Sequence, residues 1–169
     1  ASVVAAIKYT VGTNAYGYKA LGDLFVFLFF GGVSVLGSYF LQVHEFQIEL
    51  ILPATAMGLL SVGVLNLNNM RDLHTDKEVN KITMAVLFGA SLSKAYHTFL
   101  LIGAVLTAVF YVKMDIQPAY LFMIAVLPMM IHLRRVLGYT DPQEFDPELK
   151  RLAFCTFLFA ILFAIGQNL

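Results

Sequence analysis

The chain has 169 residues, of which 59% are hydrophobic and 13% are charged, with a formal net charge of zero. A water-soluble domain carries about 25% charged residues, so this composition excludes an ordinary soluble protein and indicates a membrane protein. The balanced charge gives no sign of nucleic acid as a partner.

Charge-free apolar runs follow one another along the chain. Each is a candidate membrane-spanning helix, because a helix needs about 20 mostly apolar residues, within about 17 to 25, to cross a bilayer. The five runs are Leu24 to Val43, Leu50 to Met70, Ala95 to Val112, Ile116 to Ile131, which is short, and Leu152 to Leu169. Lipid-exposed sheet edges are not tolerated in a bilayer. We therefore expect an all-α, polytopic transmembrane helix bundle with five full spans.

The first residues indicate how the chain is organised. Ala1 to Ile7 is apolar, without a basic start or an initiating Met, and it is typical of the tail of an earlier span rather than of a signal peptide. We therefore expect one transmembrane domain over residues 1–169 that lacks an amino-terminal portion. Small residues that permit close helix packing recur in the first two spans; they are Gly31, Gly32, Ser34, Gly37, Gly58, Ser61 and Gly63.

The loops between the runs predict the orientation of the chain. Three segments on one side of the membrane, Ile7 to Asp23, Arg71 to Lys94 and His132 to Arg151, hold ten of the eleven Lys and Arg residues. Only Lys113 lies on the other side. Basic residues concentrate in cytoplasmic loops, so we expect these three segments to face the cytoplasm.

The segment that follows the second run predicts a metal site. Charged groups at membrane depth are costly, by about 2.5 to 3.5 kcal/mol at a helix centre, and usually mark an ion, a proton path or a substrate. On a helix, Asp72 and Asp76 project from one face with Cβ atoms about 5 to 6 Å apart. Mg²⁺ is commonly held by one or two such carboxylates together with substrate phosphates. Asn68 offers a further oxygen ligand to the ion.

Basic residues around the two carboxylates extend this hypothesis to a polyanionic substrate. Arg71, Lys77 and Lys81 follow within a dozen positions and are able to counter phosphate charge, and Asn69 lies beside them. Acidic and basic residues interleaved in this way favour a metal with a polyanion over a metal alone. The alternative is a solvated connector whose charges form local ion pairs.

The first loop carries a weaker signal. Tyr9 and Tyr18 are candidates for contact with a carbocation through their aromatic faces, although interfacial anchoring also explains tyrosines at these positions. Asp23 is a candidate substrate contact, but an acidic residue before a helix also compensates the helix dipole. No two histidines have the spacing of a zinc motif such as HExxH, so we expect no zinc site.

Longer motifs occur along nearly the whole chain. They are YTVG from Tyr9, GYKALGD from Gly17, FFGGVSVLGSYFLQ from Phe29, ILPATAMGLL from Ile51, LNLNNMRDLHTDKEVNKITMAVLFG from Leu65, KAYH from Lys94, DPQ from Asp141 and FDPELKRLA from Phe145. Together these motifs resemble the intramembrane aromatic prenyltransferases of the UbiA superfamily, and most closely the branch that prenylates 1,4-dihydroxy-2-naphthoate in bacterial menaquinone synthesis.

The resemblance implies a reaction and roles for particular residues. Asp72 and Asp76 match the second of two aspartate-rich motifs that hold Mg²⁺ and the prenyl pyrophosphate, with Arg71 and Asn69 beside them and Lys81 near the phosphates. It implies Mg²⁺-dependent transfer of a polyprenyl group from polyprenyl pyrophosphate to 1,4-dihydroxy-2-naphthoate, giving demethylmenaquinone with loss of CO₂ and pyrophosphate. The implied location is the bacterial inner membrane, with active-site loops on the cytoplasmic side and membrane lipid around the bundle.

The chain departs from the family pattern in two respects. The first aspartate-rich motif, NDxxD, has no counterpart in these residues, so the 169 residues alone are expected to lack half of the metal site and to be inactive. Asn80 and Leu87 replace a usual glycine and a usual basic residue. Asn tolerates left-handed backbone conformations, so the turn at Asn80 is expected to survive, whereas the cation is lost at Leu87.

Other functions remain open at this point. A prenyltransferase with another aromatic acceptor fits the same motifs. A transporter or channel subunit would place carboxylates at mid-bilayer between broken helices, whereas these follow the end of an apolar run. A phosphatidyl-type alcohol transferase also uses Mg²⁺ and aspartates, but its longer DG and AR-containing motif is missing from the sequence. A catalytically inert bundle is the fourth alternative.

Overall fold

A computed structural model describes residues 19–114 and 120–168, and over these residues every regular element is helical. Most elements belong to long helices or to short extensions of them. The elements in chain order are α2 (Gly22–Val26), the π-helical segment η2 (Phe27–Gly37), α3 (Ser38–Val43), η3 (Ile48–Leu50), α4 (Ile51–Arg71), α5 (Leu73–Glu78), α6 (Met84–Val112), α7 (Met123–Gly138), η4 (Pro142–Glu144) and α8 (Phe145–Gly166).

Four helical stretches in the described part are long and apolar enough to cross a membrane: Gly22–Val43, Ile48–Arg71, Met84–Val112 and Pro142–Gly166. The predicted all-α polytopic bundle is confirmed, but the predicted count of five spans is not. The expected fourth span corresponds to α7, which has 16 residues. A helix of that length extends about 24 Å, less than the hydrocarbon core of about 30 Å. The predicted tail, residues 1–7, lies outside the described residues.

The helix α6 begins eleven positions earlier than the predicted run from Ala95, and its backbone is kinked at Gly89, where φ is 71°. Thr83 caps it, because its side-chain oxygen accepts a hydrogen bond from the backbone N–H of Val86 at 3.3 Å. Lys94 lies inside this helix. Its ammonium group donates to the backbone carbonyls of Leu137, at 3.2 Å, and Tyr139, so it satisfies acceptors at the end of α7. A charged residue therefore did not mark the start of the helix.

The helix α4 is the centre of the bundle, packed against η2, α6 and α8. Two glycines allow the closest of these contacts. A Cβ added at Gly31 would meet the backbone carbonyl of Ala54, and one added at Gly58 would lie 2.7 Å from the Phe27 ring. The predicted close packing is confirmed at these two positions. At Gly32 nothing lies within 4 Å of an added Cβ, so that glycine is not required for packing.

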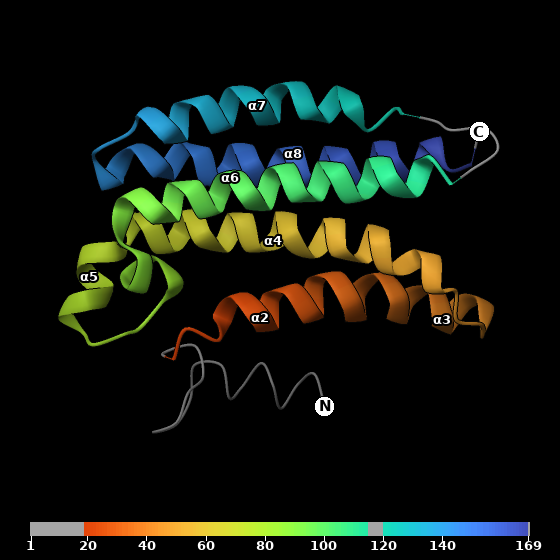
Figure 1. Cartoon of the computed structure of the whole chain (residues 1–169), viewed down its shortest axis with the longest axis horizontal. Helices are drawn as coiled ribbons and strands as arrows, with labels where there is room; N and C mark the ends of the chain where they lie inside the picture. The colour runs from red at the N-terminus through yellow and green to blue at the C-terminus, as the bar shows by residue number, and fades with distance from the viewer. Residues whose placement is uncertain (1–18, 115–119, 169) are drawn as a thin grey trace.

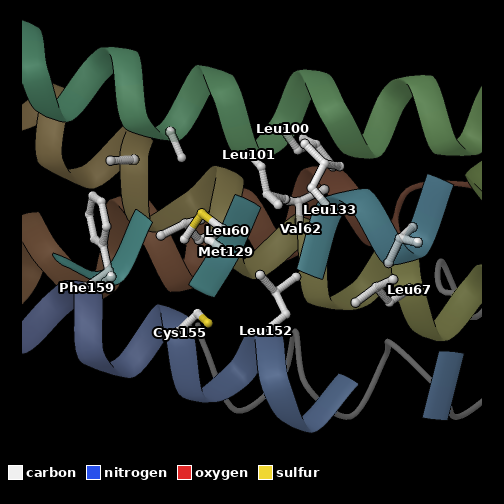
Figure 2. Packing of buried hydrophobic residues seen from close by; sticks show 14 of the residues in the cluster. Leu60, Val62, Leu67, Leu100, Leu101, Met129, Leu133, Leu152, Cys155 and Phe159 are labelled. Carbon is white, nitrogen blue, oxygen red and sulfur yellow. The ribbon is translucent and has the colours of Figure 1, made fainter. Parts of the chain in front are cut away.

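Buried apolar side chains from α4, α6, α7 and α8 converge on one core (Figure 2). Leu60 and Leu67 of α4 meet Leu100 of α6, Leu133 of α7 and Leu152 of α8 around the centre. Cys155 is also buried there as a free thiol, where it packs as a small hydrophobic residue.

Most of the described basic residues lie near helix ends at one end of the bundle. Figure 1 shows α5, the start of α2 and the α7–α8 connection together at one end, while α3 and the carboxyl terminus lie at the other. The sequence predicted that the three basic segments lie on one side of the membrane, and this arrangement agrees with that prediction.

Candidate functional site

The candidate site lies where α4 ends and α5 begins. Asp72 occupies the junction, and the backbone N–H of Asp76 donates to the Asp72 carbonyl at 2.8 Å. This bond closes one helical turn between the two residues, so the predicted i, i+4 relation of the two aspartates is present in the backbone.

The Asp72 carboxylate is held by its neighbours on α4. Arg71 donates through Nε at 2.7 Å to one carboxylate oxygen and through a terminal nitrogen at 3.0 Å to the other. Asn68 donates its amide N–H to the same carboxylate at 3.1 Å, while its own oxygen accepts from Arg71 at 2.8 Å. Arg71 also reaches Asp146 at 3.0 Å, which ties this end of α4 to the start of α8.

The Asp76 carboxylate is paired with a different cation. The ammonium group of Lys81 lies 3.1 and 3.2 Å from the two carboxylate oxygens. The turn that brings Lys81 back is closed by its backbone N–H, which donates to the Asp76 carbonyl at 2.8 Å. Asn80, within this turn, has φ of 55°, which confirms the expected left-handed backbone at that position.

An open apolar groove along the bundle extends to this cluster. It has a volume of about 430 Å³ and lies between α2 with η2, α4 and α8. Its walls include Phe30, Leu65 and Ala153, and Asn68 also lines it. Because Asn68 donates to Asp72, the groove leads to a side chain that contacts one of the two candidate carboxylates.

The remaining predicted site residues are placed differently. Asn69 is buried and Lys77 is exposed. Asp23 is buried and accepts a hydrogen bond from the Tyr96 hydroxyl at 3.0 Å, which joins α2 to α6. Tyr9 and Tyr18 lie outside the described residues.

The described residues contain no group of three or more His, Cys, Asp or Glu side chains able to hold a metal. The two aspartates alone offer hard oxygen ligands of the kind that Mg²⁺ prefers, and this ion usually takes only one or two carboxylates with substrate oxygens completing its shell. The donor chemistry therefore fits Mg²⁺, although each carboxylate is held by its own cation, Arg71 or Lys81.

A buried polar chain that the sequence reasoning missed links α6, α7 and α8. The Nε2 atoms of His97 and His132 lie 3.0 Å apart, and His132 Nδ1 lies 2.7 Å from Glu148. Tyr139 donates to Glu148 at 3.0 Å, and Arg151 also donates to it. Burial, and then the bond to Glu148, raise the pKa of the Tyr139 phenol, so it remains a donor at neutral pH. The sequence signal that could have revealed this polar chain was the presence of ionisable residues, such as His97, His132 and Glu148, inside apolar helices.

Comparison with known proteins identifies the class to which this fold and site belong. Residues 1–158 match the model of the UbiA prenyltransferase family, and the chain belongs to this family.

Individual relatives agree with that assignment. The chain is similar to the 1,4-dihydroxy-2-naphthoate octaprenyltransferase of Escherichia coli (strain K12), with 40% identity over 167 residues, 98% of this chain and 54% of that protein. It is similar to the octaprenyltransferase of the same name from Haemophilus influenzae, with 41% identity over 167 residues and the same shares of the two chains. It also resembles human UbiA prenyltransferase domain-containing protein 1, with 28% identity over 159 residues, 94% of this chain and 45% of that protein.

The chain thus spans about half the length of the curated relatives that it matches. No solved structure matches it.

Proposed function

We propose that this chain supplies a pyrophosphate-binding part of an enzyme that transfers a polyprenyl group from polyprenyl pyrophosphate to 1,4-dihydroxy-2-naphthoate. Pyrophosphate and CO₂ leave, and the product is demethylmenaquinone, formed as its quinol. Relatives named for this reaction cover 98% of the chain at 40% and 41% identity, which supports the proposal.

The observation that carries the proposal is the continuity between the apolar groove and the acidic cluster. A polyprenyl pyrophosphate has a long apolar chain and a polyanionic head, so its site must join an apolar channel to cations. The groove provides apolar walls from α2, η2, α4 and α8 and ends at Asn68. Beside Asn68 lie Asp72 and Arg71. A soluble connector with local ion pairs does not require a groove at this position.

The residues of the cluster have distinct roles in this mechanism. Asp72 and Asp76, with Asn68 beside them, would hold Mg²⁺, which neutralises charge on the departing pyrophosphate when it is bound. Arg71 and Lys81 exchange their carboxylate partners for phosphate oxygens, because phosphate accepts the same charge-assisted hydrogen bonds.

The bond changes balance within the two substrates. The allylic C–O bond breaks, and its electron pair leaves with the pyrophosphate. The ring carbon that carries the carboxylate forms the new C–C bond to the allylic cation, and the ring recovers its electrons when the carboxylate departs as CO₂. The apolar groove keeps water from the cation during this step.

The same proposal places the site at the inner surface of a bacterial cytoplasmic membrane. Arg71 bonds Asp146 at the start of α8, and Figure 1 shows α5 and the α7–α8 connection at the same end of the bundle. Arg134 and Arg135 lie in the last two turns of α7, beside that connection. Concentration of Lys and Arg at one end favours a cytoplasmic position for that end.

The proposal is tested with the whole protein that contains this chain, purified and supplied with octaprenyl pyrophosphate, dihydroxynaphthoate and Mg²⁺. Asp72→Asn and Asp76→Asn are expected to lower the rate of prenylated product formation at least about 100-fold, since each removes charge that stabilises the leaving group. Glu78→Gln is the matched control, because Glu78 is an exposed carboxylate on the same helix. A wild-type rate in both aspartate variants contradicts the mechanism; prenylation of only another aromatic acceptor contradicts the assigned substrate.

A further inference from the structure

A second groove lies between α7 and α8. Its volume is about 220 Å³, and its walls include Pro128, Ile131 and Phe154, with Arg135 and Arg151 among the lining residues. The side chain of His132 lines it from within the bundle. The groove therefore combines an apolar wall with two guanidinium groups.

The two arginines lie near the end of the bundle where α7 connects to α8. Arg135 lies three residues before the end of α7 at Gly138, and Arg151 lies six residues after the start of α8 at Phe145. Both residues are thus placed near the α7–α8 connection, at the expected headgroup level of the cytoplasmic leaflet. Long basic side chains at such positions extend their charged ends toward the interface.

One buried carboxylate, that of Glu148, lies beside both guanidinium groups and offsets only one of their two positive charges. Arg151 donates to Glu148, and a terminal nitrogen of Arg135 lies 3.7 Å from the same Glu148 oxygen. Among the described residues Glu148 is the only acidic partner of either arginine. The two arginine side chains remain 45% and 48% exposed. One positive charge is therefore in excess at the groove and accessible from outside.

The apolar wall faces outward as well. Phe154 is 63% exposed on α8, which is long and apolar enough to cross a membrane, and Ile131 is 49% exposed on the shorter α7 packed against it. A groove with a cationic end and exposed apolar walls matches the two parts of an anionic lipid, its phosphate headgroup and its acyl chain. Basic pockets between transmembrane helices at the cytoplasmic side bind acidic lipid headgroups by this complementarity.

This groove is separate from the one proposed for the prenyl chain. Ala153 and Thr156 of α8 line the prenyl groove, whereas Arg151 and Phe154 line the second groove. Each pair is displaced by two positions from the other, which is about 200° around an α-helix. The two grooves therefore lie on opposite faces of α8.

We propose that the groove between α7 and α8 binds an acidic phospholipid of the cytoplasmic leaflet, with the phosphate on Arg135 and Arg151 and one acyl chain along Ile131 and Phe154. Charge complementarity selects an anionic lipid over a zwitterionic one, because a zwitterionic headgroup adds its own cation beside the arginines. The binding does not depend on the prenyl transfer proposed above.

Native mass spectrometry of the whole protein tests this site with two lipids of matched acyl chains, phosphatidylglycerol and phosphatidylcholine. The wild type is expected to retain phosphatidylglycerol in preference. Arg135→Gln is expected to weaken that binding about fivefold, about 1 kcal/mol, the contribution of one basic residue near an anionic membrane surface. Arg134→Gln is the matched control, since Arg134 is an exposed neighbour that does not line the groove.

Arg135 is the better test position, because Arg151 directly bonds the buried Glu148 and its removal endangers folding. A second variant, Phe154→Gln, changes only the apolar wall at an exposed position and is also expected to lower phosphatidylglycerol binding. Equal retention of the two lipids by the wild type, or equal loss of phosphatidylglycerol in Arg134→Gln and Arg135→Gln, overturns the proposal.

Competition separates the lipid from other anions. Excess glycerol 3-phosphate is expected to leave bound phosphatidylglycerol in place, because it has no acyl chain for the apolar wall. Displacement of phosphatidylglycerol by glycerol 3-phosphate would show that the groove binds phosphate alone. Displacement by octaprenyl pyrophosphate in the wild type, but not in Arg135→Gln, would show that the groove binds the prenyl donor. Either result contradicts the acidic phospholipid site, and neither depends on whether Asp72 and Asp76 act in catalysis.

Discussion

The Lys81 ammonium group lies 3.1 Å from one oxygen of the Asp76 carboxylate, and only 8% of that aspartate side chain is exposed. The pair therefore holds a nearly buried negative charge at the point where the proposed mechanism requires a ligand for Mg²⁺. In the proposed mechanism, Lys81 would be available to the pyrophosphate if Mg²⁺ bound Asp76 in its place.

Lys81→Met should expose this dual role. Removal of one partner of a buried ion pair costs about 3 to 5 kcal/mol, and the 24% exposure of Lys81 favours the lower end. We expect a lower thermal unfolding midpoint in EDTA and a larger upward shift on addition of Mg²⁺ than in the wild type. Lys77→Met, at an exposed position of α5, is the control. Equal midpoints for both variants in EDTA would argue against the Asp76 pairing.

The contact between η2 and α4 predicts a contrast between two neighbouring glycines. Gly31→Ala places a methyl group against the backbone carbonyl of Ala54, whereas Gly32→Ala meets nothing within 4 Å. Overpacking of this kind costs about 1 to 3 kcal/mol. Thermal unfolding in detergent should show a lower midpoint for Gly31→Ala and little change for Gly32→Ala. Equal midpoints in the two variants would contradict the packing of these helices.

Glu148 is expected to be important for stability because it is fully buried among polar partners. Glu148→Gln removes the charge that pairs with Arg151 and contacts His132 at 2.7 Å. Loss of the acidic partner from such a network costs about 3 kcal/mol or more. The free energy of unfolding should fall by that amount, while Glu45→Gln, at an exposed loop position, should leave it unchanged. An unaltered stability would mean that the network is not formed.

The prenyl groove predicts a change in donor preference. Ala153→Phe narrows the groove from α8 and should raise the KM for octaprenyl pyrophosphate by about tenfold or more, the scale of apolar pocket discrimination. The KM for a short prenyl pyrophosphate should change much less. Ala164→Phe, at an exposed position of the same helix outside the groove, is the matched control. Parallel changes for long and short donors would indicate that the chain does not lie in this groove.

The sequence predicted the helices well where charge and helix boundaries coincide. Leu50 to Met70 matches α4 within one residue at each end, because basic and acidic residues follow directly. The start of α6 was missed because Lys94 interrupts the apolar run. In the structure Lys94 lies inside α6, beyond the kink at Gly89, and its side chain caps α7. The predicted run Ile116 to Ile131 also stops before the end of α7. The helix continues to Gly138 and includes the charged residues Arg134 and Arg135.

The candidate site was partly readable from local spacing. The turn at Asn80 and the helical relation of Asp72 and Asp76 depend on residues close in sequence, which is why motif reasoning reached them. His97 and His132 are 35 positions apart, and only the packing of α6 against α7 brings them to 3.0 Å. The ion pair between Lys81 and Asp76 depends on the direction of the turn after α5, and the spacing of the two residues in the sequence does not specify that direction.

The most direct measurement concerns the ion itself. Mn²⁺, a paramagnetic substitute for Mg²⁺, is titrated into the whole protein in the presence of an unreactive prenyl thiopyrophosphate, and bound ion is followed by electron paramagnetic resonance. The account predicts that Asp72→Asn and Asp76→Asn each weaken Mn²⁺ binding more than about tenfold, because even residues that only hydrogen-bond to metal ligands contribute that much to metal affinity. Glu78→Gln should bind Mn²⁺ like the wild type. Wild-type Mn²⁺ affinity in both aspartate variants would contradict it.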